Sequence, residues 1–389
     1  MRNPNLLLVV LLLNVFMLGG ERKPVPANVA ATAPYSPGLM TGEYLYVSGQ
    51  LGRDAAGTVP KSIEDQAKII LDSLKSIMEG AGLTMDHIVY TNLFLTDIRN
   101  YEAVNKIYAT YFPNVKPARA TIGVARLPYS CGMEISAVAV RDLASKKAVD
   151  RPRAQTAVPI TEGIRTRDRF FLSGTLGRDA TTGVVPKTGF DQVKVALERA
   201  KGTLKLAGLT EAAFVSVNVY HTAAISRDDI DKAWARQFGG HVKAPVTYIR
   251  VNELALGARF GITGVAALNT KQVRFKNNCG VLGETVYCAV EESGMGSIEQ
   301  QTRDTITRLG RNAAGLGFGL EDVSATQLYI DSMDDFAKMN ASYIESLPAP
   351  RPARATVQPA PSGESRRLIQ ATLIASRSGA EGSSKRKAK

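Results

Sequence analysis

The feature that most constrains the fold of this chain is a long-period internal repeat. The run SGQLGRDAAGTVPK at residues 48–61 returns as SGTLGRDATTGVVPK at 173–187. The tripeptide AGL closes a predicted helix three times, at 81–83, 207–209 and 314–316. A repeat of about 110 residues in a chain of 389 residues predicts three tandem copies of one domain.

Each copy shows the same order of predicted elements: a hairpin, a helix, a strand, a second helix and two strands. In the first long helix, Ile70, Leu74 and Ile77 fall on one face at helical spacing, so this helix can pack on a sheet. Short amphipathic helices are predicted at 100–112, 227–238 and 333–344. Helices confined to one face of a mixed sheet indicate an α+β sandwich.

We expect the domain boundaries at the junctions LASKKAVDRPRAQT and NTKQ. The predicted domains are residues 28–142, 154–268 and 271–376. Residues 1–27 are expected to hold a signal peptide and a linker, and residues 377–389 a basic disordered tail.

The N-terminus carries the pattern of a secretory signal peptide. Arg2 precedes the apolar run LLLVVLLLNVFML at 6–18, and small residues follow it. Cleavage after Gly20 and cleavage after Ala27 both fit, and an uncleaved signal anchor is the alternative. We therefore expect a secreted protein, or one in the lumen of the secretory pathway, with no membrane contact after signal cleavage.

The formal net charge of +12 raises the question of a nucleic-acid partner. Part of that charge lies in the C-terminal tail and part in the run KKAVDRPR at 146–153. No RNA-binding pattern of aromatic and basic residues accompanies either stretch, so no specific nucleic-acid partner is expected. The three cysteines and three histidines are too few and too scattered for a structural zinc site, and no metal is expected.

Cys279 and Cys288 flank the run GVLGETVY, whose pattern predicts a β-hairpin with its turn at Gly283-Glu284. Counting outward from the turn places the two cysteines opposite each other, within the range of a disulfide. We expect this bond if the chain is secreted, and two reduced strand cysteines otherwise.

Arg119 is the residue most suited to binding a ligand. It follows Pro117 at the start of an alternating run, so Arg119 and Thr121 share one face of a strand. The following strand is expected to bring Glu134 back beside them. A guanidinium matches a small carboxylate, and a nearby carboxylate can activate water. The alternative is an Arg119–Glu134 ion pair that only stabilises the sheet edge.

The first copy resembles the RidA (YjgF-like) family of enamine/imine deaminases. The resemblance rests on APYSPGLMTGEYLYVSGQLGRD, GTVPK, NYEAVNKIYATYF and KPARATIGVARLPYSCGMEISAVAV, which occur in family order. The other two copies are similar more weakly along their whole length. The resemblance implies chorismate-mutase-like α+β domains, with ligand sites between neighbouring copies and no cofactor.

The resemblance also implies the site residues. The carboxylate-binding arginine of the family corresponds to Arg119 and again to Arg354, and the acidic residue that activates water corresponds to Glu134. The remaining implied substrate-binding positions are Tyr35, Ser48, Gly49, Asn105, Asn340, Thr121 and Thr356.

The three copies are unequal at these positions. The second copy keeps only the Ser-Gly pair and otherwise has Ile160, Asp231, Val246 and Gly261. The third copy has Ala289-Val290 for the Ser-Gly pair, and Leu368 or Ile369 where the glutamate is expected. These sets imply that only a cleft holding Arg119, Thr121 and Glu134 is complete, with an unidentified neighbouring copy supplying part of its wall.

The implied activity is hydrolysis of small 2-imino or enamine acids, such as 2-aminoacrylate, to 2-keto acids and ammonia. Three fused copies are expected to form a monomeric pseudo-trimer. A non-catalytic protein that binds small carboxylates, or serves as a scaffold, is the alternative, because two copies lack part of the catalytic set. An RNA-directed role, sometimes proposed for the family, is the third hypothesis.

Overall fold

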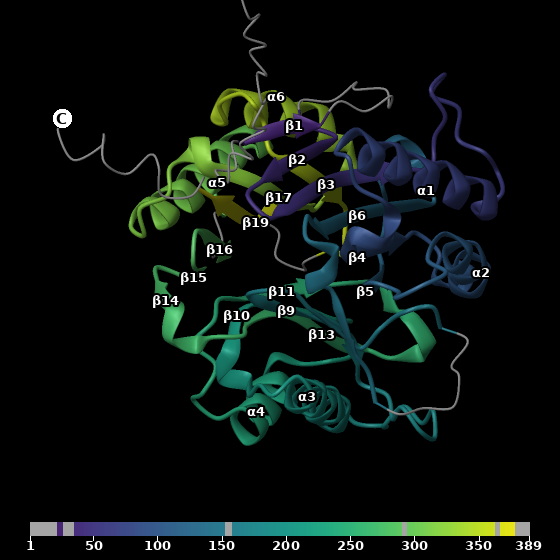
Figure 1. Cartoon of the computed structure of the whole chain (residues 1–389), viewed down its shortest axis with the longest axis vertical. Helices are drawn as coiled ribbons and strands as arrows, with labels where there is room; N and C mark the ends of the chain where they lie inside the picture. The colour runs from purple at the N-terminus through teal and green to yellow at the C-terminus, as the bar shows by residue number, and fades with distance from the viewer. Residues whose placement is uncertain (1–21, 26–34, 152–157, 290–293, 362–365, 378–389) are drawn as a thin grey trace, which may run out of the picture.

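The structure is a computed structural model that describes residues 22–25, 35–151, 158–289, 294–361 and 366–377. It contains three similar units, here called units 1, 2 and 3 in chain order. Figure 1 shows their three helix pairs at the periphery, with the strands gathered between them. The predicted α+β architecture of three tandem domains is confirmed.

Each unit has the predicted order of elements. Unit 1 contains β2 (Gly38–Thr41), β3 (Tyr44–Leu51), α1 (Ile63–Gly80), β4 (Ile88–Leu95), α2 (Tyr101–Tyr111), β5 (Ala118–Gly123) and β6 (Met133–Val140). Unit 2 contains β8 (Gly163–Arg165), β9 (Arg169–Leu176), α3 (Gly189–Leu206), β10 (Phe214–His221), α4 (Arg227–Gln237), β11 (Val246–Arg250) and β13 (Phe260–Ala267). Unit 3 contains β15 (Cys279–Leu282), β16 (Thr285–Ala289), α5 (Ile298–Ala314), β17 (Val323–Ile330), α6 (Phe336–Ser346), β18 (Ala353–Val357) and β19 (Ile369–Ser376).

The long helix of unit 1 forms and packs as its periodicity predicts. Ser62 caps α1 by accepting a hydrogen bond from the backbone N–H of Asp65. The predicted apolar face, with Ile70, Leu74 and Ile77, is fully buried against the sheet. Removal of these side chains from water is the main term that holds the helix on the sheet.

The strand order within a unit differs from the one expected. In unit 1 it is β3-β6-β4-β5, with β5 parallel to β4 and β6 antiparallel to β4. The strand of Arg119 is therefore not adjacent to the strand of Glu134, because β4 lies between them. The chain reaches this order by crossing from β5 over β4 before it enters β6.

Each unit has one further edge strand, which in units 1 and 2 lies outside the expected boundaries and in unit 3 lies inside them. β1 (Lys23–Val25) pairs with β2, β7 (Lys147–Val149) pairs with β8, and β14 (Val273–Lys276) pairs with β15. The expected starts at residues 28 and 154 were thus too late, because edge strands of three residues have too little pattern to be recognised. At the other end, Arg377 is paired with Glu284, so the expected tail begins one residue too early.

The units contact one another in a ring. β12 (Glu253–Leu254) of unit 2 pairs with β5 of unit 1. Arg126 of unit 1 forms a bridge with Gln358 of unit 3, and Gln370 of unit 3 donates to the Tyr248 carbonyl of unit 2. Each pair of units therefore shares an interface, and these three interfaces are described below.

Arg169 of unit 2 lies where all three units meet. Its guanidinium carbon lies 4.0 Å from the ring centroid of Tyr44 of unit 1, and it donates to the hydroxyl of Tyr287 of unit 3. It also pairs with Asp168 at 2.6 Å. One buried cation therefore links all three units through paired and stacked contacts.

The cysteine hairpin has the expected register, with Cys279 opposite Cys288 and Leu282 opposite Thr285. The two sulfurs are bonded, and their Cα atoms lie 4.1 Å apart. Cys131 is a buried free cysteine. The predicted signal sequence lies outside the described residues, and among the helices that are described none has the length and apolar character to cross a bilayer.

Candidate functional site at the interface of units 1 and 3

Arg354 is buried between units 1 and 3. It lies on β18 with only 3% of its surface exposed. Its guanidinium carbon is 4.8 Å from the ring centroid of Tyr343 and 5.8 Å from that of Phe336, both on α6. Tyr35 of unit 1 closes another side at 5.3 Å. The aromatic faces stabilise a cation that has been removed from water.

A hydroxyl of unit 1 fixes the strand that carries Arg354. The backbone N–H of Arg354 donates to Ser48 Oγ at 2.8 Å, and Ser48 Oγ donates to the Ser36 carbonyl at 2.6 Å. Ser48 and Gly49 lie at a bulge of β3, where the pairing with β6 is interrupted between Val47 and Gln50. The bulge turns these two residues toward the neighbouring unit.

Glu134 lies beside Gly49 and faces unit 3. A Cβ atom on Gly49 would lie only 2.0 Å from Glu134 Oε1, so only glycine leaves room for the carboxyl group. Glu134 accepts a hydrogen bond from the backbone N–H of Thr356. Burial raises the pKa of Glu134 to about 8, although Arg354 and the Thr356 N–H favour the ionised form. A carboxyl group that titrates near neutrality can both take and give a proton.

Three polar atoms converge on this interface without a partner in the protein. They are Arg354 Nη1, Glu134 Oε1 and Thr356 Oγ1. A buried polar atom without a hydrogen bond costs stability, so native proteins contain few of them. A positive group, a titratable carboxyl and a hydroxyl, contributed by two units, could together bind a small polar anion and a water molecule.

The structure places Arg119 and Glu134 in different interfaces, which corrects the expected cleft. Ile135 packs in the core of unit 1, so Glu134, its neighbour along β6, points out of the unit. Arg119 points the other way, toward α2, where its guanidinium carbon lies 4.7 Å from the ring centroid of Tyr108. Arg119 and Glu134 therefore face different neighbouring units, Arg119 facing unit 2 and Glu134 facing unit 3.

Arg119 belongs to the interface of units 1 and 2. Its backbone N–H donates to Ser173 Oγ at 2.9 Å, and its Nη2 donates to Asn105 Oδ1 at 2.7 Å. Gly174 and Gly261 of unit 2 line the same space, with Gly261 where unit 1 has Glu134. This interface thus has the arginine but no carboxyl group opposite it.

The interface of units 2 and 3 has neither group. Val246 of unit 2 occupies the position of the arginine. In the register of β17 with β19, Gln370 lies opposite Tyr329, as Glu134 lies opposite Phe94 in unit 1. Gln370 therefore stands where the glutamate was expected, and the assignment to Leu368 or Ile369 was wrong.

Two residues near the Arg354 site, Tyr129 and Arg53, were not predicted from the sequence. Tyr129 of unit 1 stacks under the guanidinium of Arg53 at 4.1 Å and lies edge-on to Phe336 of unit 3. Both interact electrostatically with the buried hydroxyl of Tyr35. Arg53 lies in the LGRD run that recurs in unit 2, and this repeat was the available signal.

The remaining expected positions divide between the interfaces. Asn340 lies on α6 of unit 3, and its Oδ1 is buried without a partner. Thr121 lines the space between units 1 and 2 together with Arg119. Within the described ranges, no cluster of three or more His, Cys, Asp or Glu side chains could hold a metal ion.

Comparison with known proteins settles the family. Residues 26–141, 151–268 and 280–363 each match the family described as Endoribonuclease L-PSP. The chain belongs to the endoribonuclease L-PSP family. The three matches make it a tandem member of that family, and the resemblance to RidA proteins is confirmed by the curated relatives.

Single-domain members of the endoribonuclease L-PSP family align with about a third of this chain. The mouse 2-iminobutanoate/2-iminopropanoate deaminase is 39% identical over 114 residues, which cover 29% of this chain and 84% of that protein. A RutC family protein of Saccharolobus solfataricus is 37% identical over 121 residues, covering 31% and 92%. The structure of the E. coli YjgF gene product is 36% identical, covers 31% of this chain and 99% of that chain, and has a TM-score of 0.30.

Proposed function

We propose that this protein hydrolyses small 2-imino or enamine acids to 2-keto acids and ammonia at the interface of units 1 and 3. The observation that carries the proposal is the convergence of Arg354 Nη1, Glu134 Oε1 and Thr356 Oγ1, all buried and without partners. Relatives named as 2-iminobutanoate/2-iminopropanoate deaminases support the choice of reaction.

Arg354 binds the substrate carboxylate through Nη1 and fixes the imine carbon near Glu134. Its position does not change on binding, because Tyr343 and Ser48 already hold the side chain and the strand. The entropy cost of positioning the Arg354 side chain is therefore met when the protein folds and not when the substrate binds.

Glu134 holds the water that attacks the imine carbon. The ionised carboxylate takes a proton from this water as the carbon–oxygen bond forms. That proton passes to the imine nitrogen and gives a carbinolamine. Glu134 then moves the proton of the new hydroxyl group to the amino nitrogen, and as the carbonyl forms the carbon–nitrogen bond breaks and ammonia and a 2-keto acid leave. A carboxyl group with a pKa near 8 suits both transfers at neutral pH.

Because the three units are fused, one chain supplies both sides of the site between units 1 and 3. We propose that the chain is a monomer in which the units take the places of three separate subunits. The ring of contacts through Gln358 and Gln370 supports this arrangement. Size-exclusion chromatography with light scattering tests it, and a mass near 41.8 kDa is expected.

The two arginines give a matched test of the function. An amino-acid oxidase generates imino acids, and trapping with semicarbazide reports their lifetime. Arg354→Ala is expected to lower the hydrolysis rate about 100-fold or more, because the substrate carboxylate loses the charged donor that positions it. Arg119→Ala is expected to retain the wild-type rate, since it lies at another interface.

The opposite pattern would restore the cleft of Arg119 as the active site. An inert wild-type protein, under conditions where the mouse relative is active, would favour the alternative of a non-catalytic carboxylate-binding protein. Thermal unfolding of each variant shows whether it is folded.

A further inference from the structure

The strands of all three units surround a cavity that the proposed reaction does not use. These are the strands that Figure 1 shows gathered between the three helix pairs. The cavity has a volume of about 140 Å³. We call it the central cavity, and its lining includes Tyr46 and Asn92 of unit 1, Phe171 and Asn218 of unit 2, and Tyr287 and Gln327 of unit 3.

The lining of the central cavity follows the internal repeat. Each unit contributes one amide side chain, which lies opposite a hydroxyl group on the paired strand: Asn92 opposite Ser136, Asn218 opposite Thr263, and Gln327 opposite Thr372. Each unit also contributes one aromatic ring, and these rings are Tyr46, Phe171 and Tyr287. The cavity therefore has polar groups and flat apolar walls side by side.

One position in the lining breaks the repeat. Unit 1 has Tyr90 there, whereas units 2 and 3 have Ser216 and Ala325 at the same register. The two small side chains leave space that a tyrosine in each unit would fill. Identical separate subunits would all carry the same residue, so this difference is possible only because the units are fused.

The same difference leaves a polar atom of unit 2 without a partner. In unit 1 the hydroxyl of Tyr90 donates to Asn92 Oδ1 at 3.1 Å. In unit 2 the matching acceptor, Asn218 Oδ1, is buried and has no hydrogen-bond partner in the protein. Ser216 is too short to supply the donor that a tyrosine would bring. A ligand hydroxyl that reaches Asn218 Oδ1 would remove the cost of this unsatisfied acceptor.

The neighbours of Tyr90 show what surrounds a ring at this position. Its ring is stacked on Phe171 of unit 2 with the centroids 6.2 Å apart, and its hydroxyl lies 3.1 Å from Thr263 Oγ1. One unit further round the ring, the equivalent residues are Tyr287 and Thr372 of unit 3. Both line the central cavity, so a ring beside Ser216 would meet the same kinds of groups.

Arg354 borders the cavity but does not offer its charge to it. Ala353 and Ala355 also line the cavity, and side chains alternate along a strand. The guanidinium of Arg354 therefore lies on the opposite face of β18, where it packs on Tyr343 of α6 at 4.8 Å.

The rest of the lining favours an uncharged ligand. No Asp, Glu or Lys side chain is found among the described residues that line the cavity. Arg169 donates to the hydroxyl of Tyr287 and is itself paired with Asp168. A cation would be repelled by Arg169, and an anion would lose its hydration without gaining a free partner.

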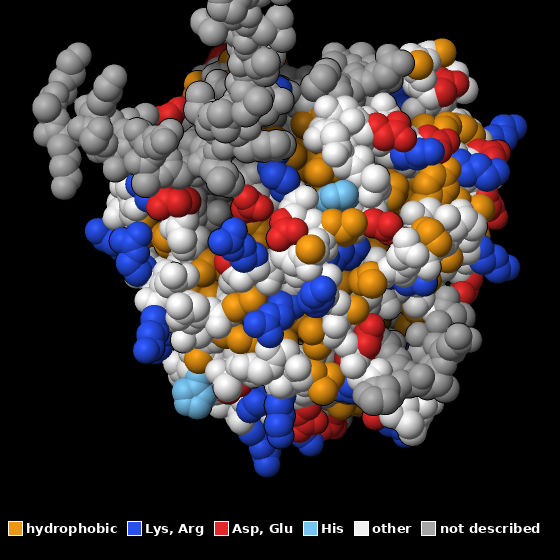
Figure 2. Space-filling model, viewed as in Figure 1, with side chains coloured by type: hydrophobic (Ala, Val, Ile, Leu, Met, Phe, Trp, Pro, Cys, Tyr) orange, Lys and Arg blue, Asp and Glu red, His pale blue; other side chains and the backbone are white. Residues whose placement is uncertain are grey.

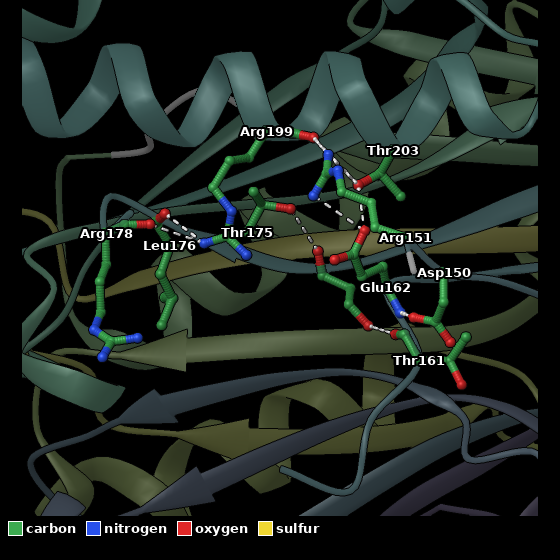
Figure 3. Close-up of polar contacts among 10 residues, drawn as sticks. Asp150, Arg151, Thr161, Glu162, Thr175, Leu176, Arg178, Arg199 and Thr203 are labelled. Atoms are coloured by element: carbon green, nitrogen blue, oxygen red, sulfur yellow. Dashed lines mark hydrogen bonds and ion pairs between the residues drawn. The ribbon is translucent and has the colours of Figure 1, made fainter. Parts of the chain in front are cut away.

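The wall of unit 2 is braced from outside the cavity. Phe171 lies on β9, and Figure 3 shows Arg199 reaching from α3 toward the backbone at the end of this strand. Arg199 Nη1 donates to the carbonyl of Leu176 at 3.3 Å and to that of Arg178 at 3.0 Å. A wall that is fixed before the ligand arrives lowers the entropy cost of binding.

We infer that the central cavity binds one small uncharged phenol, whose ring takes the place of the tyrosine missing from unit 2 and whose hydroxyl donates to Asn218 Oδ1. The volume fits this class of ligand, because a protein cavity of about 150 Å³ holds a benzene molecule. The inference does not depend on the deaminase activity, since neither Glu134 nor the guanidinium of Arg354 takes part.

Isothermal titration of the full chain with 4-methylphenol tests the inference. This probe is the tyrosine side chain cut at its Cβ atom, and one equivalent is expected to bind. Ser216→Tyr gives unit 2 the residue that unit 1 already accommodates and is expected to weaken binding about tenfold or more, because the new side chain fills the space. Ala325→Tyr makes the same change in unit 3 and is the second variant of this kind.

The hydrogen bond is tested separately from the space. Asn218→Leu keeps the shape of the side chain and removes the acceptor, so binding of 4-methylphenol is expected to weaken about tenfold. Toluene lacks the hydroxyl group, and its binding is expected to change less than about twofold in this variant. Equal weakening of both compounds would overturn the role of Asn218.

Glu134→Gln separates this site from the proposed active site. It is expected to bind 4-methylphenol as the wild type does, because Glu134 does not line the cavity, while its hydrolysis rate falls. Thermal unfolding shows which variants are folded. A wild-type protein that takes up no 4-methylphenol, or undiminished binding in a folded Ser216→Tyr or Ala325→Tyr variant, would overturn the inference.

Discussion

The backbone N–H of Arg354 donates a hydrogen bond to Ser48 Oγ at 2.8 Å, although 306 positions separate the two residues. The same bond joins Arg119 to Ser173 at 2.9 Å. Each serine holds the arginine strand of another unit against its own sheet. The arginine therefore faces the unit that supplies the serine, which is why Arg354 faces Glu134 of unit 1 and Arg119 faces Gly261 of unit 2.

Gly49→Ala is expected to reduce imine hydrolysis about 100-fold. The new Cβ atom would lie 2.0 Å from Glu134 Oε1, so the carboxyl group must move by more than an ångström. Gly174→Ala is the matched control, because its Cβ would lie 3.3 Å from the Cα atom of Ala120 and meet no carboxyl group. Equal loss in both variants would contradict the role given to Glu134.

The pH dependence of kcat/KM is expected to report Glu134. Only the ionised form can take a proton from water, so activity should rise with pH and level off above about pH 8. Glu134→Gln removes this base and should give a low rate with no such rise. The coupling oxidase must be in excess at each pH. If kcat/KM of Glu134→Gln still rises with pH, the rise must come from the titration of another group.

Glu134 also makes stability depend on pH. Its pKa is raised from 4.5 to about 8, so the folded state binds the proton more tightly than the unfolded state. The free energy of unfolding should therefore fall by about 1.4 kcal/mol per pH unit between about pH 4.5 and pH 8 from this group alone. Urea unfolding of wild type and Glu134→Gln at several pH values checks it, since the difference between them should grow in favour of the variant as pH rises.

Local elements were predictable from the sequence, whereas their partners were not. The helix of Ile70 and Leu74 and the hairpin of Cys279 depend on short-range patterns, and both have the expected geometry. The placement of Glu134 at the interface with Arg354 depends on β4 lying between β5 and β6, which no local pattern specifies.

A one-residue difference hid the counterpart of the glutamate in unit 3. Thr356 and Gln370 are 14 positions apart, whereas Thr121 and Glu134 are 13 apart, as the residue numbers show. The extra residue falls between β18 and β19, where length varies at little cost. Only the pairing of β17 with β19 identifies Gln370 as the counterpart.

The net charge of +12 does not collect in one region of the visible surface. On the face drawn in Figure 2, Lys and Arg side chains are spread among acidic and apolar ones. On this face, the described side chains form no continuous basic stripe that would follow a phosphate backbone. The expectation that nucleic acid is not a specific partner stays a prediction, and salt-dependent RNA binding would contradict it.

The disulfide of Cys279 and Cys288 gives a test of stability and of compartment. The bond closes a short loop, so replacing both cysteines with serine should lower the free energy of unfolding by about 2 kcal/mol.

Alkylation under denaturing conditions should find one free thiol, that of Cys131, in protein purified from its natural compartment. Three free thiols would place the protein in a reducing compartment and contradict secretion.

If the chain is exported, the contacts of β1 favour one of the two expected cleavage sites over the other. Val25 is 5% exposed and pairs with Gly38, while Arg22 donates to the Pro350 carbonyl of unit 3 at 3.0 Å. Cleavage after Ala27 would remove both contacts, whereas cleavage after Gly20 would keep them. We therefore propose that the exported protein begins at residue 21, and sequencing of its N-terminus checks this.

Two truncated chains measure what β1 contributes. A chain of residues 28–389 is expected to be less stable than one of residues 21–389 by about 2 kcal/mol, because it exposes the sheet edge and loses the buried side chain of Val25. Urea unfolding of both, at one pH and one salt concentration, gives the difference. Equal stability of the two chains would show that β1 is dispensable. A natural N-terminus at residue 28 would show that the signal ends at Ala27.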